Sequence, residues 1–156
     1  MSKDRVQGGA SSSVENSSLV VVLQVNGRRA LFTGDIKEAA TAQLAANWGS
    51  LGRAQVFLVT HHGSGSGSSS DLLKKIQPRF AVISVGATNT FGHPSPATID
   101  RLHAPPAKTE RIYCTATIGT VRATISTSGA IPWKTTGQAA PWWSRTGGKM
   151  GLCAGQ

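Results

Sequence analysis

The sequence predicts a layered α/β domain with a mixed sheet and helices on one face. Short apolar runs at residues 19–25, 30–32, 56–59 and 80–85 are each followed by a glycine or a polar residue, as buried strands are. Residues 36–48 carry apolar side chains three and four positions apart, which is typical of a helix. In such folds, ligands bind beyond the carboxyl ends of the strands.

Length and composition limit the chain to one domain or a piece of one. It has 156 residues and a formal net charge of +9, from 16 Lys and Arg against 7 Asp and Glu. This balance favours an anionic partner such as nucleic acid or a phosphate ester. A basic surface without a special partner explains it equally well, because the basic residues are scattered. No apolar run is long enough to span a membrane and no signal peptide is recognised, so we expect a cytoplasmic protein.

The first half of the expected sheet is a hairpin. Residues 1–13 lack periodicity, and we expect them to be disordered. Residues 19–25 form a β-branched run that suits a central strand. The dipeptide at 26–27 is Asn-Gly, a strong hairpin signal, so residues 28–32 should return antiparallel. The hairpin then delivers residues 33–35 beside the start of its first strand.

Asp35 stands at or just before the expected helix over residues 36–48, which Gly49 closes. Two roles are open for it. A helix N-cap is common for aspartate. A metal ligand is the other role, since carboxylate and imidazole groups are ligands that zinc and manganese accept.

Two adjacent histidines follow the next strand, expected over residues 55–60. His61 and His62 precede an alternating Gly-Ser stretch, 63–70, that reads as a flexible loop. A single histidine is usually structural, but this loop offers the pair no core to pack in. Residues 71–76 form a short helix with a serine cap.

A third histidine, His93, follows the strand expected over residues 79–86. Taken alone it reads as a solvated loop residue. Ser95 and Pro96 then start a helix, because serine is a good cap and proline suits the first turn. Three strand ends therefore bring Asp35, His61 and His93 toward one edge of the sheet.

The C-terminal part is less regular. Residues 111–116 and 120–126 read as a hairpin across residues 118–119. From residue 131 the composition changes to Trp, Gly, Pro and basic residues without periodicity. We therefore expect a domain over residues 14–130 and an irregular tail over 131–156. Tryptophans of this tail could cover an apolar surface or stack on bases.

The motifs in order resemble one family. They are N-S-S-L at 16–19, L-F-T-G-D at 31–35, V-T-H-H-G-S at 59–64, S-V-G at 84–86 and G-H-P-S-P at 92–96. This set resembles the metallo-β-lactamase superfamily, in particular the hydrolase domain of ComEC-like competence proteins. Each motif alone is weak, whereas five in this order are a strong signal. The resemblance covers about residues 14–127.

The resemblance implies an αββα sandwich with a two-metal site, usually zinc or manganese. It implies that Asp35 bridges the two metals and that His61, or else His62, completes one metal's shell. It implies that His93 contacts the substrate or transition state, so that Asp35 and His93 are the catalytic pair. It further places Asn16 and Ser64, with His93, as substrate-binding residues.

The chain departs from the family in one respect: it contains no H-x-H motif and only four histidines. Members of the family bind most of their metal through an H-x-H-x-D-H motif, so the chain resembles only the second half of the domain. Asp35 and one or two histidines cannot hold two ions alone.

The first hypothesis is therefore a partial hydrolase. It would cleave a phosphodiester or another ester, and be inactive or weak unless a second copy or another chain supplies the missing ligands. The second hypothesis is a non-catalytic module that binds nucleic acid or protein. A half sandwich also leaves an apolar sheet face, which should drive dimerisation or aggregation. A different α/β fold that imitates the motif order is the third possibility.

Overall fold

The computed structural model describes residues 17–137, 143–144 and 148–149. The expected disorder of residues 1–13 lies outside these ranges. No helix among the described residues is both long and apolar enough to cross a membrane.

The main element is a mixed sheet, which confirms the predicted α/β class. Its first five strands run side by side in chain order: β1 (Val21–Val25), β2 (Arg28–Phe32), β3 (Val56–Leu58), β4 (Phe80–Ile83) and β5 (Arg111–Cys114). β1 and β2 form the expected antiparallel hairpin, and β2 to β5 are parallel to one another. Short antiparallel strands β8 (Trp143–Ser144) and β9 (Gly148–Lys149) continue the sheet beyond β5.

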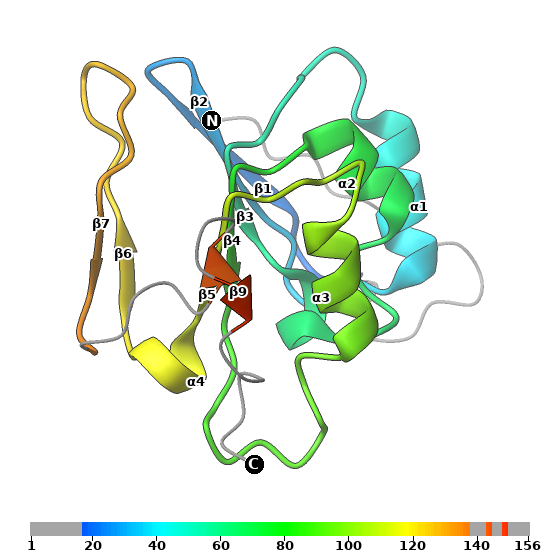
Figure 1. The fold of residues 1–156 in the computed structure, drawn as a ribbon. Helices are drawn as coiled ribbons and strands as arrows, with labels where there is room; N and C mark the ends of the chain where they lie inside the picture. The colour runs from blue at the N-terminus through cyan, green and yellow to red at the C-terminus, as the bar shows by residue number, and fades with distance from the viewer. Residues whose placement is uncertain (1–16, 138–142, 145–147, 150–156) are drawn as a thin grey trace.

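Three helices cover one face of this sheet (Figure 1). They are α1 (Glu38–Asn47), α2 (Ser70–Ile76) and α3 (Pro96–His103), and each connects one parallel strand to the next. Parallel neighbours need such crossovers, because a tight turn cannot join them. The main core lies between the helices and the sheet. Its fully buried members include Leu31, Phe57 and Ile83 on strands and Leu72 and Leu102 on helices.

The opposite face carries a separate two-stranded sheet, β6 (Val121–Ala123) and β7 (Trp133–Thr135) (Figure 1). The Trp133 ring stacks on Tyr113 of β5, with centroids 4.5 Å apart, and meets Phe80 of β4 edge-on at 5.1 Å. These rings form a second, smaller core with Ile118. Trp133 thus covers an apolar surface, one of the two roles considered for the tryptophans.

One expected pairing is wrong. Residues 111–116 and 120–126 do not form a hairpin, because β5 pairs with β4 and β6 pairs with β7. The helical turn α4 (Thr115–Ile118) and Gly119, at φ 69°, turn the chain away from the main sheet between them. Within residues 131–156, where we expected irregular structure, Trp133–Thr135 supplies the partner strand.

β6 and β7 leave much of this face open. An apolar groove of about 410 Å³ lies beside them, lined by Leu23, Val25, Ala30, Phe32, Val56, Leu58, Val82, Val121, Ala123, Ile125 and Trp133. Leu23 and Phe32 at its β1–β2 end are 37% and 39% exposed. The predicted apolar sheet face is therefore present.

Candidate functional site

Backbone hydrogen bonds tie together the chain just beyond β2, β3 and β4. The amide of His61, after β3, donates to the carbonyl oxygen of Gly34, after β2, at 3.0 Å. The amide of Ser95 donates to the carbonyl oxygen of Gly63 at 2.8 Å, which joins the loop after β4 to the loop after β3. The three strand ends therefore share one edge of the sheet, as the sequence predicts.

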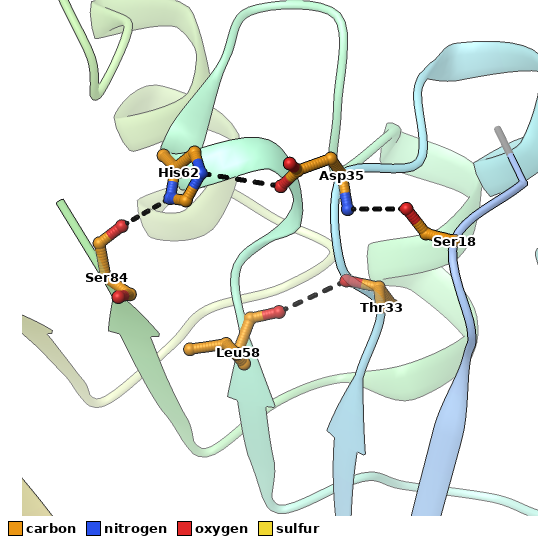
Figure 2. Close-up of polar contacts among 6 residues, drawn as sticks. All are labelled: Ser18, Thr33, Asp35, Leu58, His62 and Ser84. Atoms are coloured by element: carbon orange, nitrogen blue, oxygen red, sulfur yellow. Dashed lines mark hydrogen bonds and ion pairs between the residues drawn. The ribbon is translucent and has the colours of Figure 1, made fainter. Parts of the chain in front are cut away.

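Asp35 lies in the turn between β2 and α1, and it does not cap the helix. The N-cap residue of α1 is Lys37, two positions later. The amide of Asp35 donates to Ser18 Oγ at 3.2 Å, and its 45% exposed side chain lies with Oδ1 3.5 Å from Nε2 of His62 (Figure 2). Of the two roles considered for Asp35, helix capping is wrong, and the carboxylate is available to a ligand.

Gly34 makes this turn possible. Its φ is +57°, a left-handed conformation that costs glycine little. A Cβ at this position would lie 2.9 Å from the Cβ of Ser18 and 3.1 Å from its hydroxyl oxygen. The glycine therefore lets the chain before β1 pack directly against the turn that carries Asp35. Thr33, at the start of the turn, donates its hydroxyl to the carbonyl oxygen of Leu58 at 3.3 Å (Figure 2).

His61 and His62 both adopt left-handed backbone conformations, with φ of 48° and 53°. Such conformations cost non-glycine residues on the order of 1–3 kcal/mol each and persist where surrounding contacts impose them. Here the bond from the His61 amide to Gly34 is one such contact. The two left-handed residues turn the chain sharply after β3, at the edge of the sheet where both imidazoles lie.

The ring of His62 is held between two strand ends. Its Nδ1 lies 2.7 Å from the carbonyl oxygen of Ser84, after β4 (Figure 2). A carbonyl oxygen can only accept, so Nδ1 must carry the proton. In the neutral ring, Nε2 then presents a lone pair to the Asp35 carboxylate 3.5 Å away. A proton on Nε2 or a bound cation between these two acceptors would make the contact attractive.

The His61 ring is a neighbour of the His62 and His93 rings. Its ring centroid is 6.3 Å from that of His62 and 5.8 Å from that of His93, both in edge-to-face geometry. Its Nδ1 is buried and has no hydrogen-bond partner among the described residues. Buried polar atoms are rarely left unpaired in native proteins, so this nitrogen is a candidate ligand atom. The structure nevertheless places His62, rather than His61, beside Asp35.

His93 is fixed by its own loop. Its amide donates to Oδ1 of Asn89, and Nδ2 of Asn89 donates back to the His93 carbonyl oxygen, both at 3.0 Å. Burial lowers the pKa of His93 below its usual value of 6.5, and the charges of His61 and His62 lower it further. The Phe91 ring stacks on the His93 ring at 6.0 Å with planes 22° apart.

The Gly-Ser loop after the histidines is not a free linker. The guanidinium of Arg101, on α3, donates to the carbonyl oxygens of Gly65 at 2.9 Å, Gly67 at 3.0 Å and Ser68 at 3.2 Å. The Ser68 hydroxyl also bonds to that of Thr60 at 2.7 Å, where both side chains are fully buried. The expectation of a flexible loop overlooked these bonds.

Ser64 and Asn16 were expected to bind substrate together with His93. Ser64 is only 9% exposed, and its hydroxyl oxygen lies 3.1 Å from that of Ser66 in its own loop. Asn16 lies outside the described residues.

An open cavity of about 430 Å³ lies beside His62 and His93. It is lined by His62, Ser84, Val85, Gly86, Asn89, Phe91, His93 and Thr115. Sequence reasoning did not single out Asn89, Phe91 or the loop-binding Arg101, and it included Ser84 only as part of the S-V-G motif. Ser84 acts through its backbone carbonyl, a role that its side chain does not indicate, and Arg101 acts from 33 or more residues away. Phe91 stands two positions before His93 in a glycine-containing loop, which was an available signal.

The donor set at this edge is incomplete. Within the described part of the chain, no three or more His, Cys, Asp or Glu side chains are grouped so as to hold a metal ion. Asp35 and His62 are in direct contact, and the His61 ring centroid lies 6.3 Å from that of His62.

No family model matches the chain. It is 33% identical over 132 residues to Recombination protein 2 of Haemophilus influenzae, which covers 84% of this chain and 16% of that protein. It is 31% identical over 83 residues to ComE operon protein 3 of Bacillus subtilis, 53% of this chain and 11% of that protein. It is 33% identical over 87 residues to Competence protein ComA of Neisseria gonorrhoeae, 56% of this chain and 13% of that protein.

The chain thus spans about one tenth to one sixth of the length of these curated relatives. The matches cover half or more of the chain itself. The chain is a distant homologue of part of the ComEC-type competence and recombination proteins.

Proposed function

We propose that this chain is half of a metal-dependent hydrolase domain of the metallo-β-lactamase type, and that Asp35, His61 and His62 contribute to its zinc or manganese site. The observation that carries the proposal is the pair formed by His62 and Asp35. The Ser84 carbonyl fixes the proton on Nδ1, so that Nε2 faces the carboxylate with a lone pair. This is the usual arrangement of a metal-ligating histidine, whose other nitrogen donates to a carbonyl or carboxylate.

The spacing fits a metal ion. Two ligands of a tetrahedral zinc ion, each about 2.0–2.2 Å from it, lie about 3.3–3.5 Å from each other. Nε2 of His62 and Oδ1 of Asp35 are 3.5 Å apart. The unpaired Nδ1 of His61 supplies a further nitrogen at the same edge. A bound metal would supply an activated water and polarise the bond to be cleaved. The chain's own residues would hold the ion and, through His93, contact the substrate.

The remaining ligands would come from outside the described residues, and a second copy of this chain or another chain is one source. The apolar groove beside β6 and β7 supports such a partner, because exposed apolar surface of this kind marks interaction sites. The isolated chain should accordingly be a weak metal binder without useful activity.

The proposed substrate is a nucleic-acid phosphodiester. The net charge of +9 favours a polyanion. The curated relatives carry the names of competence and recombination proteins, which suits a DNA substrate. Location in the cytoplasm stays a prediction.

Zinc titration by calorimetry tests the metal assignment. The wild-type chain should bind zinc weakly, and both Asp35→Asn and His62→Ala should weaken this binding further or abolish it. Asp100→Asn, an exposed aspartate on α3, is the matched control and should bind as the wild type does. Equal zinc binding by wild type and Asp35→Asn, or no binding by wild type, would contradict the proposal. Nucleic-acid binding without zinc binding would instead favour the non-catalytic module.

A further inference from the structure

Phe91 is the most exposed large apolar side chain in the described structure. It is 80% exposed, whereas Leu19, the next, is 55% exposed. It lies in the loop after β4 and lines the same cavity as His62 and His93. Isolated exposed apolar residues are common, so exposure alone means little. What distinguishes Phe91 is its position in one cavity with two imidazoles.

Hydrogen bonds of Asn89 hold the loop on both sides of Phe91. Asn89 donates to the carbonyl oxygens of Gly86 at 3.2 Å and His93 at 3.0 Å, and it accepts from the His93 amide. The Phe91 ring also stacks on His93. A ring on an ordered loop costs less conformational entropy to bind than a ring on a loose loop, which favours binding.

We propose that Phe91 and the cavity next to it form a subsite for one unpaired nucleobase, which places the adjoining phosphate at His62 and His93. This inference rests on the proposed function only in taking nucleic acid as the ligand. Every base has a π-face, so an exposed aromatic ring binds single strands with little sequence preference. A base in a duplex is covered by its neighbours, so the subsite requires a single-stranded or displaced base.

The cavity suits this ligand in size and character. Its volume of about 430 Å³ falls within the range of about 300–1,000 Å³ usual for small-ligand sites. Val85, Gly86 and Phe91 give it an apolar part, and His62 and His93 give it a polar part. A nucleotide has the same division into a flat, largely apolar ring system and an anionic phosphate.

The test compares two labelled single-stranded oligonucleotides of equal length by fluorescence anisotropy at fixed salt: one with bases and one abasic. Phe91→Ala should weaken binding of the base-containing strand by about 5- to 150-fold, the effect of losing about 1–3 kcal/mol of stacking. It should leave binding of the abasic strand unchanged. Phe91→Trp should retain the preference for bases.

Two further variants sharpen the comparison. Phe32→Ala removes another partly exposed phenylalanine that lines the apolar groove rather than this cavity, and should bind both strands as the wild type does. Gly86→Met should reduce the preference for bases, because a Cβ at Gly86 meets no atom within 4 Å and the new side chain enters open space.

Equal affinity of the wild type for both strands, or the same loss on both strands in Phe91→Ala, would overturn the inference. The measurement is made in the presence of a chelator, so it does not depend on the metal site. A chain that prefers base-containing strands but binds no zinc would keep this subsite while the hydrolase proposal fails.

Discussion

The Ser84 carbonyl orients the ring of His62. Nδ1 of His62 lies 2.7 Å from the Ser84 carbonyl oxygen, and Nε2 lies 3.5 Å from the Asp35 carboxylate. Three strand ends thus determine the state of one ring. The carbonyl after β4 fixes the tautomer, the turn after β3 carries the ring, and the turn after β2 supplies the charge.

The first prediction concerns this tautomer. Neutral His62 should carry its proton on Nδ1, because the Ser84 carbonyl can only accept. Nitrogen chemical shifts from long-range proton–nitrogen NMR correlations report which nitrogen is protonated. Addition of zinc should shift Nε2 of His62 and leave Nδ1 protonated. A proton on Nε2 in the neutral ring would contradict the arrangement.

A second prediction concerns Gly34. Gly34→Ala should destabilise the protein by roughly 1–3 kcal/mol, since alanine must adopt φ +57° and its Cβ approaches the Cβ of Ser18 to 2.9 Å. Chemical denaturation measures the loss. Ser18→Gly removes the side chain that is approached, so Gly34→Ala should cost less in that background. Gly52→Ala is the control for φ alone, because a Cβ at Gly52, at φ +71°, meets no atom within 4 Å.

A third prediction concerns Arg101. Arg101→Met should remove its bonds to three loop carbonyls and speed hydrogen exchange of the amides between residues 64 and 68. The expected loss of stability is about 1–3 kcal/mol, because hydrogen bonds from a charged donor are being lost. Arg53→Met removes a single exposed bond to the Gln77 carbonyl and should leave the loop unchanged. Unchanged exchange in Arg101→Met would show that the loop is held by other contacts.

A fourth prediction uses the fact that Tyr113 is the only tyrosine in the chain. Burial raises its pKa above the usual 10.0, and a hydrogen bond and charge from Arg111 oppose this only partly. Ultraviolet absorbance of tyrosinate should therefore titrate above pH 10 in the folded protein and near pH 10 in denaturant. Because the folded-state pKa is the higher one, this group's stabilising contribution is full below about pH 10 and is lost as pH rises through the folded value. Tyr113→Phe should weaken that dependence.

A fifth prediction concerns the apolar groove. Leu23 and Phe32 are 37% and 39% exposed at its β1–β2 end, and β1 is an edge strand. The double variant Leu23→Ser, Phe32→Ser should reduce self-association, measured by sedimentation velocity over a range of concentrations, if a second copy covers this face. Leu51→Ser, on an exposed residue outside the groove, is the control. Persistent self-association in the double variant would place the contact elsewhere.

Local signals in the sequence determined most elements of the main sheet. Asn26 and Gly27 set the β1–β2 hairpin, and Ser69 caps α2 by accepting from the Leu72 amide, as its residue type indicates. The apolar runs predicted β2, β3 and β4, so the order of Asp35, His61 and His93 along one edge followed from the parallel arrangement. These features depend on neighbours in the chain, which a sequence displays directly.

Tertiary structure alone decided the contacts that give those residues their chemistry. The sequence left Asp35 open between helix cap and ligand, and the start of α1 at Glu38, after Lys37, decided against the cap. Sequence suggested that β5 and β6 pair, but β4 and β7 are their partners. The Ser84 carbonyl and the Arg101 side chain act across 22 and more than 30 residues. Such contacts depend on how strands and helices pack, and no short stretch of sequence contains that information.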